Sequence, residues 1–146
     1  MLASELCGGC FCGAVRFEAR EIFDTGYCHC SICRRFSGAP ALAWANLPAR
    51  SFRITRGSPK GFASSERWVR YFCAECGCPV FGRHPHPPEA GSDLVCFSIL
   101  SLNEPLQIRP SVHTWCSARM PWFDTTDDLP RFPDGELSPS DTRRDE

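Results

Sequence analysis

The stretch YCHCSICRRFSGAP, residues 27–40, places three cysteines within six positions. Cys28, Cys30 and Cys33 follow a C-x-C-x-x-C spacing, which keeps three sulfur atoms close together along a short piece of backbone. A structural zinc ion normally takes four protein ligands, whereas a catalytic zinc ion keeps an exchangeable fourth position. The spacing therefore predicts a three-thiolate zinc site with room for a further ligand, and these three cysteines are the candidate catalytic residues.

The sequence leaves the fourth ligand of this site open. A side chain from elsewhere could close it into a second structural site, and the candidates are Cys7, Cys78, Cys96, Cys116 and His113. His29 lies between two of the ligands. On an extended strand its side chain would point away from the metal, so we assign it a packing or surface role.

A second set of cysteines is formed by two pairs sixty residues apart. Cys10 and Cys12 are spaced C-x-C, and both side chains would project from one face of an extended strand. Cys73 and Cys76 are spaced C-x-x-C, and Gly77 permits the tight backbone that such a turn needs. Together they predict a closed four-thiolate structural zinc site that joins the first strand to a later hairpin.

The three-thiolate site suits thiol chemistry better than hydrolysis. Zinc with three thiolates already has a net negative charge, so its bound water is less acidic than water on a three-histidine zinc. A thiophilic position of this kind favours capture of an exogenous thiol as its thiolate. Arg34 and Arg35 follow directly and could offset the added negative charge; the alternative is that they are solvent-exposed or form local salt bridges.

The cysteine count and the chain's first residues favour metal binding over disulfides. The 146 residues contain eleven cysteines, an odd number with short spacings. The beginning of the chain, MLASELCGGC, has neither the basic region nor the apolar region of a secretory signal. The uncharged, apolar stretch at residues 94–103 is too short to span a bilayer. We therefore expect a cytoplasmic protein with no membrane association.

Charge is balanced overall but unevenly distributed. The formal net charge is −1, which makes the chain a poor candidate for a general nucleic-acid binder. Residues 50–70 carry six cations and one acid, a pattern that fits either a solvated strand face or a site for an anionic small molecule. Residues 134–146 contain one apolar side chain other than proline. We expect this acidic tail to be disordered and to follow a single domain over 1–133.

Short β-rich runs separated by Gly and Pro turn signals predict a mainly β fold. In SFRIT, Phe52 and Ile54 alternate with polar residues, as in a half-buried strand. No clear helical periodicity is present. We expect a small antiparallel domain, an open barrel or sandwich with little helix. The expected strands lie within residues 14–19, 41–47, 51–57, 67–73, 94–100 and 112–116.

Several longer motifs resemble one known family. GGCFCGAVRFEA, CHCSICRRFSGAP, FCAECGCPVF, SLNEP and VHTWCSARMPW occur in the order and spacing of the glutathione-dependent formaldehyde-activating enzymes, whose domain is shared with centromere protein V. The resemblance covers roughly residues 8–133. It implies a zinc-containing, mostly β fold. It also implies a structural site at Cys10, Cys12, Cys73 and Cys76 and a catalytic-type zinc on Cys28, Cys30 and Cys33.

The same resemblance implies a carbon–sulfur lyase that joins glutathione and formaldehyde to S-hydroxymethylglutathione, or cleaves that adduct. Its expected partner is a small thiol such as glutathione. The competing hypothesis is a non-catalytic zinc module that binds a protein or nucleic-acid partner, as the centromere relatives suggest. His113 is a candidate general base, although a core histidine is the alternative role. The sequence does not indicate the oligomeric state.

Overall fold

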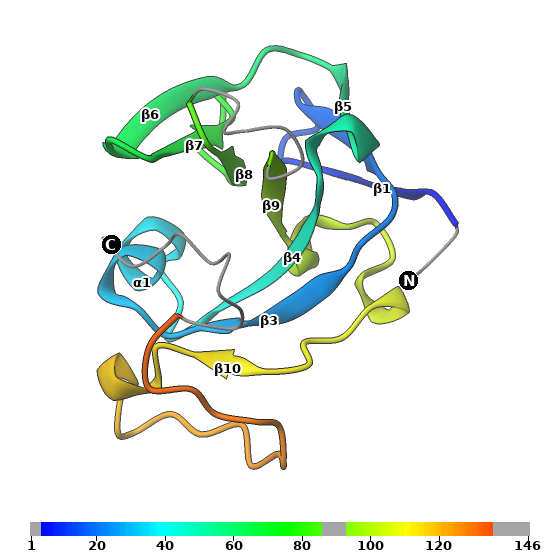
Figure 1. Ribbon diagram of the computed structural model, residues 1–146. Helices are drawn as coiled ribbons and strands as arrows, with labels where there is room; N and C mark the ends of the chain where they lie inside the picture. The colour runs from blue at the N-terminus through cyan, green and yellow to red at the C-terminus, as the bar shows by residue number, and fades with distance from the viewer. Residues whose placement is uncertain (1–3, 86–92, 136–146) are drawn as a thin grey trace.

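A computed structural model describes residues 4–85 and 93–135 of the chain. Within these residues the protein consists of two β-sheets, one short α-helix and four single-turn 3₁₀ helices (Figure 1). All strand pairs except one are antiparallel. The predicted fold class, a mainly β antiparallel domain with little helix, is confirmed.

The larger sheet has seven strands in the order β10-β3-β4-β9-β8-β7-β6. The two-residue strand β10 pairs in parallel with β3, placing His113 opposite Tyr27. The strands are β3 (Asp24–Cys28), β4 (Leu42–Pro48), β6 (Lys60–Ser65), β7 (Trp68–Phe72), β8 (Pro79–Arg83), β9 (Leu94–Ser98) and β10 (His113–Thr114).

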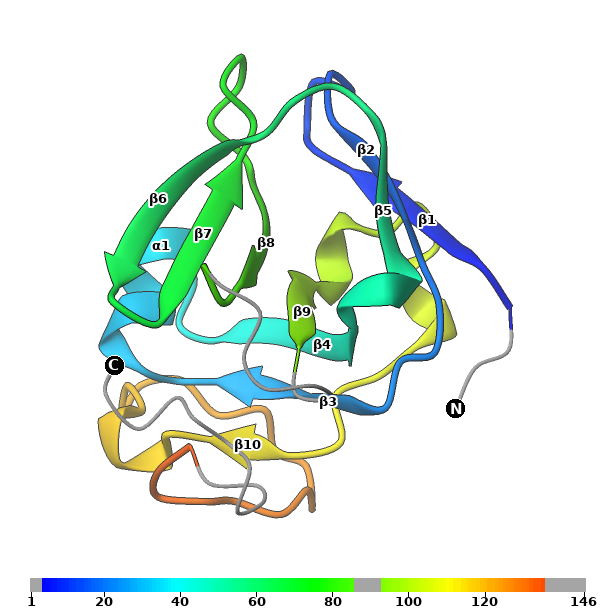
Figure 2. The same cartoon turned by 45° about the horizontal axis from the view of Figure 1, so that its top comes forward.

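The smaller sheet has the order β1-β2-β5. A 3₁₀ turn connects β4 of the larger sheet to β5 of this one. Figure 2 shows this sheet on one side of β9 and the β6–β7 hairpin on the other. Its strands are β1 (Leu6–Gly9), β2 (Arg16–Ala19) and β5 (Phe52–Arg56). The helix is α1 (Ser31–Ser37), and the 3₁₀ turns are η1 (Ala49–Ser51), η2 (Ile99–Ser101), η3 (Pro105–Gln107) and η4 (Cys116–Ala118).

The core lies between the two sheets and is built on aromatic contacts. The ring centroid of Phe17 on β2 lies 5.0 Å from that of Phe52 and 5.3 Å from that of Phe97 on β9. The ring centroids of Phe52 and Phe81, which lies on β8, are 4.7 Å apart. Burial of such rings is a main source of folding free energy. The core therefore fixes β8 and β9 relative to the small sheet. These two strands also line a cavity.

Each of the six predicted runs coincides with a strand, respectively β2, β4, β5, β7, β9 and β10; five of these strands lie wholly within their runs, and β4 extends one residue further, to Pro48. Four strands and the helix were not predicted. β1 contains two glycines and β8 begins with Pro79, residue types that are rare in strand interiors. β6 has no buried residue along its length, so it shows no alternation. These strands form because their pairing partners hold them.

Two further predictions concern the ends of the chain and the membrane. Among the described residues, no helix is long and apolar enough to cross a bilayer. The predicted tail begins at Asp134, whose carbonyl accepts a hydrogen bond from the Trp115 backbone N–H at 3.0 Å. Gly135 is buried beside the indole ring of Trp115. Residues 136–146 lie outside the described part of the chain, so the disordered tail stays a prediction.

Candidate functional site

The four cysteines of the predicted structural site lie together. Cys10 and Cys12 belong to the turn between β1 and β2, and Cys73 and Cys76 to the connection between β7 and β8. Their four sulfur atoms all lie within 4.8 Å of one another. The expectation that the C-x-C pair sits on an extended strand is wrong, because the chain turns directly after Gly9. The cluster joins a hairpin of the small sheet to a hairpin of the large sheet.

Backbone N–H groups around this cluster favour thiolates. Cys10 Sγ accepts a hydrogen bond from the Val15 N–H at 3.2 Å. The Cys78 N–H lowers the pKa of Cys76 to about 6, with a further contribution from Cys12. Gly77 has φ +75°, a backbone conformation that glycine adopts without strain. Four converging sulfurs with such support fit the tetrahedral coordination of a structural zinc ion, so this cluster could hold zinc.

The second cluster consists of Cys28, Cys30 and Cys33, each less than 10% exposed. Cys28 ends β3 and Cys33 lies in the first turn of α1. Cys30 is the N-cap of this helix, and its Sγ accepts a hydrogen bond from the Cys33 N–H at 3.2 Å. The stretch 28–30 is thus a strand end followed by a helix cap. The strand geometry assumed for His29 is therefore wrong.

The three sulfurs lie within 4.8 Å of one another, so this cluster could also hold zinc. Hydrogen bonds from the thiols of Cys28 and Cys33 lower the pKa of Cys30 to about 2. The same interaction with Cys30 raises the pKa of Cys28 to about 12. One thiolate stabilised by two neighbouring thiols is an arrangement from which a metal ion can displace the remaining protons. The donor set fits a soft metal such as zinc.

Within residues 4–85 and 93–135, no fourth histidine, cysteine or carboxylate joins this cluster. The candidates for that role lie elsewhere. Cys7 is exposed on β1, Cys78 follows the four-cysteine cluster, and Cys116 begins η4. Cys96 is near, on β9, and lines the cavity described below. A three-cysteine site with room for an external ligand is thus what the described residues provide.

His113 is buried, as the core role considered for it from the sequence requires, and both of its ring nitrogens have hydrogen-bond partners. Its Nε2 lies 3.0 Å from Asp127 Oδ1, and its Nδ1 lies 2.9 Å from His29 Nε2. A carboxylate can only accept, so His113 donates from Nε2 and accepts at Nδ1 from His29. The Thr125 hydroxyl and the Leu129 N–H also donate to Asp127, and together these donors lower its pKa to about 2.

His29 ends this chain of hydrogen bonds between two cysteines of the cluster. It is 1% exposed, and burial, reinforced by the nearby His113, lowers its pKa to about 4. Its Nδ1 has no hydrogen-bond partner among the described residues. The backbone N–H of His29 donates to the Thr114 carbonyl at 3.1 Å. The network therefore anchors the Cys28–Cys30 segment to β10 and to the Asp127 loop.

Replacement of His113 by phenylalanine is expected to destabilise the metal-loaded protein by about 1–3 kcal/mol. The ring would still stack on Tyr27, whose centroid lies 4.9 Å from that of His113. The His29 Nε2–H and the Asp127 carboxylate would each lose a buried partner. Urea unfolding measures the loss. Asp127→Asn retains an oxygen that can accept from His113, so its free energy of unfolding is expected to fall by less. If His113→Phe were as stable as the natural protein, the stabilising role of the network would be contradicted.

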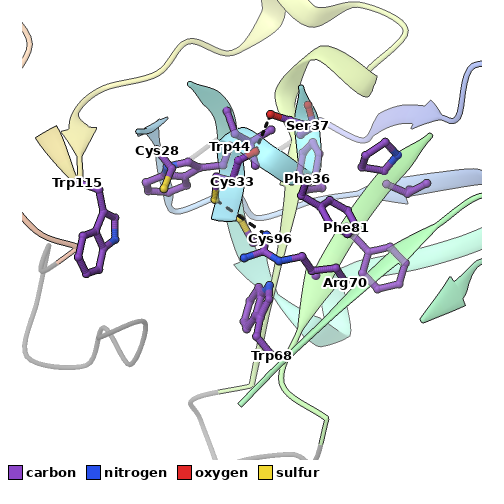
Figure 3. A pocket seen from close by; sticks show the side chains of 16 residues that line it. Cys28, Cys33, Phe36, Ser37, Trp44, Trp68, Arg70, Phe81, Cys96 and Trp115 are labelled. Atoms are coloured by element: carbon purple, nitrogen blue, oxygen red, sulfur yellow. Dashed lines mark hydrogen bonds between the residues drawn. The ribbon is translucent and has the colours of Figure 1, made fainter. Parts of the chain in front are cut away.

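A cavity opens beside Cys28 and Cys33, with a volume of about 60 Å³. One water molecule needs roughly 10–15 Å³ of such space, so the cavity has room for on the order of five water-sized groups. Its walls come from α1, β4, β7, β8 and β9 (Figure 3). Six aromatic rings take part: Phe36, Trp44, Trp68, Phe81, Phe97 and Trp115. Gly82 allows the close approach of Trp68, since a Cβ there would lie 2.4 Å from the indole nitrogen.

Arg70 on β7 is the one charged side chain among the described residues that line this cavity. It is 6% exposed. Its Nη1 lies 4.0 Å from Cys33 Sγ, its Nε donates to Ser64 Oγ at 3.1 Å, and its guanidinium lies over the Phe36 ring. Figure 3 shows this guanidinium directed at the Cys33 sulfur, close to Trp68. Arg70 thus carries positive charge to the cysteine cluster.

The predicted arginine pair lies outside the cavity lining. Arg34 is half-buried, and its Nε donates to the His29 carbonyl at 3.3 Å. Arg35 is exposed on α1. Their assignment as ligand-binding residues stays a prediction. Arg70 was noted only as part of the basic run 50–70. A signal was present, since the period of two puts Arg70 on the same face of its strand as Trp68.

The structure is thus a small, mainly antiparallel β protein with two cysteine clusters that could each hold a metal ion. The second cluster is buried and lies beside a cavity. Residues 5–118 match the family described as "Glutathione-dependent formaldehyde-activating enzyme". The chain belongs to this family, as its motifs indicated. It is also similar to a solved structure described as a Rhodobacter sphaeroides protein. That similarity has a TM-score of 0.57 at 24% identity and covers 75% of this chain and 100% of the other, which supports the fold.

Proposed function

We propose that the protein is a zinc-dependent enzyme of the carbon–sulfur lyase type that forms or cleaves the adduct of a thiol with formaldehyde. Family membership supports a function related to glutathione and formaldehyde. The observation that carries the proposal is the three-cysteine cluster, whose sulfurs converge beside a cavity with no fourth ligand among the described residues. Cys28, Cys30 and Cys33 would hold the metal, and Cys10, Cys12, Cys73 and Cys76 a structural zinc ion.

Zinc on the three cysteines would supply a thiophilic position that holds an exogenous thiol as its thiolate. The chain's own residues prepare the place for it. The Cys33 N–H and the neighbouring thiols stabilise negative charge on Cys30. The Arg70 guanidinium, 4.0 Å from Cys33 Sγ, offsets part of the charge that several thiolates accumulate. The aromatic walls limit access of water, which strengthens these interactions.

In the synthetic direction the thiolate sulfur attacks the carbonyl carbon of formaldehyde and forms a carbon–sulfur bond. The π electrons of the carbonyl move to its oxygen. That oxygen takes up one proton, so the proton lost by the thiol is regained and the product is a hydroxymethyl thioether. In the reverse direction the carbon–sulfur bond breaks and the thiolate leaves. His113 is fully engaged by His29 and Asp127, so we assign it to positioning rather than to proton transfer.

The cellular setting that fits this chemistry is the cytoplasm. None of the eleven cysteines, all of which lie in the described residues, forms a disulfide, a state that reducing compartments maintain. Small thiols are abundant there. The partner we infer is a small thiol, with no role for a nucleic acid or a membrane.

The first experiment combines metal content with turnover. Protein purified without chelator is expected to contain two zinc ions per chain, one of which responds to added thiol. With ¹³C-formaldehyde and glutathione, exchange NMR is expected to show adduct formation faster than in the absence of protein. Two zinc ions that ignore every thiol, with no acceleration, would instead favour a non-catalytic zinc module that binds a partner macromolecule.

A further inference from the structure

We propose that Ser98 is a further catalytic residue, whose hydroxyl donates a hydrogen bond to the oxygen of the carbonyl substrate while the carbon–sulfur bond forms. The inference rests on the proposed function and deepens it, because it names the group that stabilises the charge developed in that reaction. It is carried by the position of Ser98 in the cavity lining and by the engagement of the other polar groups there.

The backbone of β9 turns the Ser98 side chain toward the cavity. Ser98 is the last residue of β9 and is half-buried. Cys96, two residues earlier, and Trp44, its pairing partner on β4, line the same cavity. Residues two apart on a strand share one face of the sheet, as do residues directly opposite in an antiparallel pair. The Ser98 hydroxyl therefore faces the space that Cys28 and Cys33 border.

The Ser98 hydroxyl is not used within the described part of the chain. Ser98 is the N-cap of η2, a position where a serine oxygen commonly accepts from a backbone N–H of the first turn. Its side chain makes no such hydrogen bond, although its carbonyl accepts from Ser101 Oγ at 2.7 Å. The hydroxyl thus keeps its proton for a molecule bound in the cavity.

Two other polar side chains of the lining serve the protein itself. Ser37 Oγ donates to the Cys33 carbonyl at 2.7 Å and accepts from the Ala39 N–H at 3.2 Å. The Arg70 Nε donates to Ser64 Oγ, and its Nη1 lies 4.0 Å from Cys33 Sγ. Ser37 therefore holds the end of α1, and Arg70 faces the cysteine cluster.

The remaining donors of the lining are weak or packed against backbone. Cys96 offers a thiol, which is a weak donor. The three indoles of the lining each press the edge beside Nε1 onto a glycine. A Cβ would lie 2.4 Å from Trp68 Nε1 at Gly82, 2.5 Å from Trp115 Nε1 at Gly135, and 3.0 Å from Trp44 Cε2 at Gly26. Ser98 thus supplies the uncommitted hydroxyl of the described lining.

The proposed reaction needs such a donor. A cavity of about 60 Å³ is small enough for a carbonyl group attacked by a sulfur at the cysteine cluster to lie close to the opposite wall. As the carbon–sulfur bond forms, the π electrons move to the carbonyl oxygen, and an unpaired charge among apolar walls is strongly unfavourable. The Ser98 O–H donates to this oxygen and keeps its own proton, while the oxygen takes up a proton from water. A donor fixed where charge develops is a large contribution to catalysis.

The test separates catalysis from thiol binding on the zinc-loaded protein. Ser98→Ala is expected to lower kcat for adduct formation from glutathione and formaldehyde about ten-fold or more, because one donor to the developing oxyanion is lost. Exchange NMR measures this rate. Glutathione affinity, followed by tryptophan fluorescence, is expected to stay unchanged. Ser58→Ala, at an exposed loop position, is the control that should alter neither quantity.

A second pair of variants tests the hydroxyl at constant shape. Ser98→Thr keeps a hydroxyl and is expected to retain most of the activity, whereas Ser98→Val replaces it with a methyl group and is expected to lose the same factor as Ser98→Ala. Equal rates for the threonine and valine substitutions would contradict the role of the hydroxyl, even if Ser98→Ala failed to fold.

The outcomes distinguish this inference from the function on which it rests. If Ser98→Ala turned over as fast as the natural protein, the role of Ser98 would be overturned and the lyase chemistry would stand. Absence of acceleration by the natural protein would overturn both. A loss of glutathione affinity in Ser98→Ala that matched its loss of rate would also refute the assignment, because Ser98 would then act in binding or folding.

Discussion

Cys73→Ser is expected to leave the chain largely unfolded at ambient temperature. Cys73 is 1% exposed, and its sulfur lies 3.7 Å from that of Cys12, so it connects the β7–β8 hairpin to the small sheet. A structural zinc ion in a small domain contributes about 10–16 kcal/mol of apparent free energy, as measured in zinc-finger peptides. The whole stability of a domain is typically about 5–15 kcal/mol. Loss of one thiolate therefore removes a contribution as large as the net stability.

Far-UV circular dichroism and zinc analysis measure this effect. The variant is expected to lose its β signal and to bind no zinc at the four-cysteine cluster. Cys78→Ser is the matched control: it lies in the same connection, its thiol donates to the Pro79 carbonyl, and it does not belong to the cluster. This control is expected to fold with two zinc ions. A folded Cys73→Ser protein that also retains both metals would refute the structural assignment of the cluster.

The cysteine clusters were the part of the site most accessible to sequence reasoning. Their members are encoded locally as C-x-C, C-x-x-C and C-x-C-x-x-C, spacings that bring thiols close together along the chain. The union of Cys10 and Cys12 with Cys73 and Cys76 followed from counting ligands, and the structure brings the four together. The local backbone conformation around the second cluster was harder to predict. His29 was considered on a strand, but it lies between the end of β3 and Cys30, which caps a seven-residue helix too short to show periodicity.

The surroundings of the clusters depend on tertiary pairing and could not be derived from spacing. The parallel pairing of β10 with β3 brings His113 beside Tyr27 and within reach of His29. That pairing involves two residues of a strand more than eighty positions away. Arg70 is a similar case: its strand was predicted, but its approach to Cys33 requires the β7–β8–β9–β4 order of the sheet. Sequence patterns fix the face of a strand and not its neighbours.

Cys30→Ser is expected to abolish thiol binding while leaving a folded protein with one zinc ion. Serine at this position retains an oxygen that can cap α1 in place of Sγ, so the helix should persist. The serine hydroxyl is a poor zinc ligand compared with a thiolate, and two remaining cysteines are insufficient to hold the metal. Because the four-cysteine cluster is untouched, the core and the two sheets keep their connection.

Zinc analysis, circular dichroism and thiol titration together test this prediction. Cys116→Ser is the control, since Cys116 is partly exposed and belongs to neither cluster. It is expected to retain two zinc ions and full thiol affinity. If Cys30→Ser kept its thiol affinity after losing the second metal, the thiol would bind through the aromatic walls and Arg70 alone. The cluster would then have a structural role, and the proposed lyase chemistry would be contradicted. Loss of metal and thiol binding together, in a folded chain, would identify the three cysteines as ligands of the metal that holds the reacting sulfur.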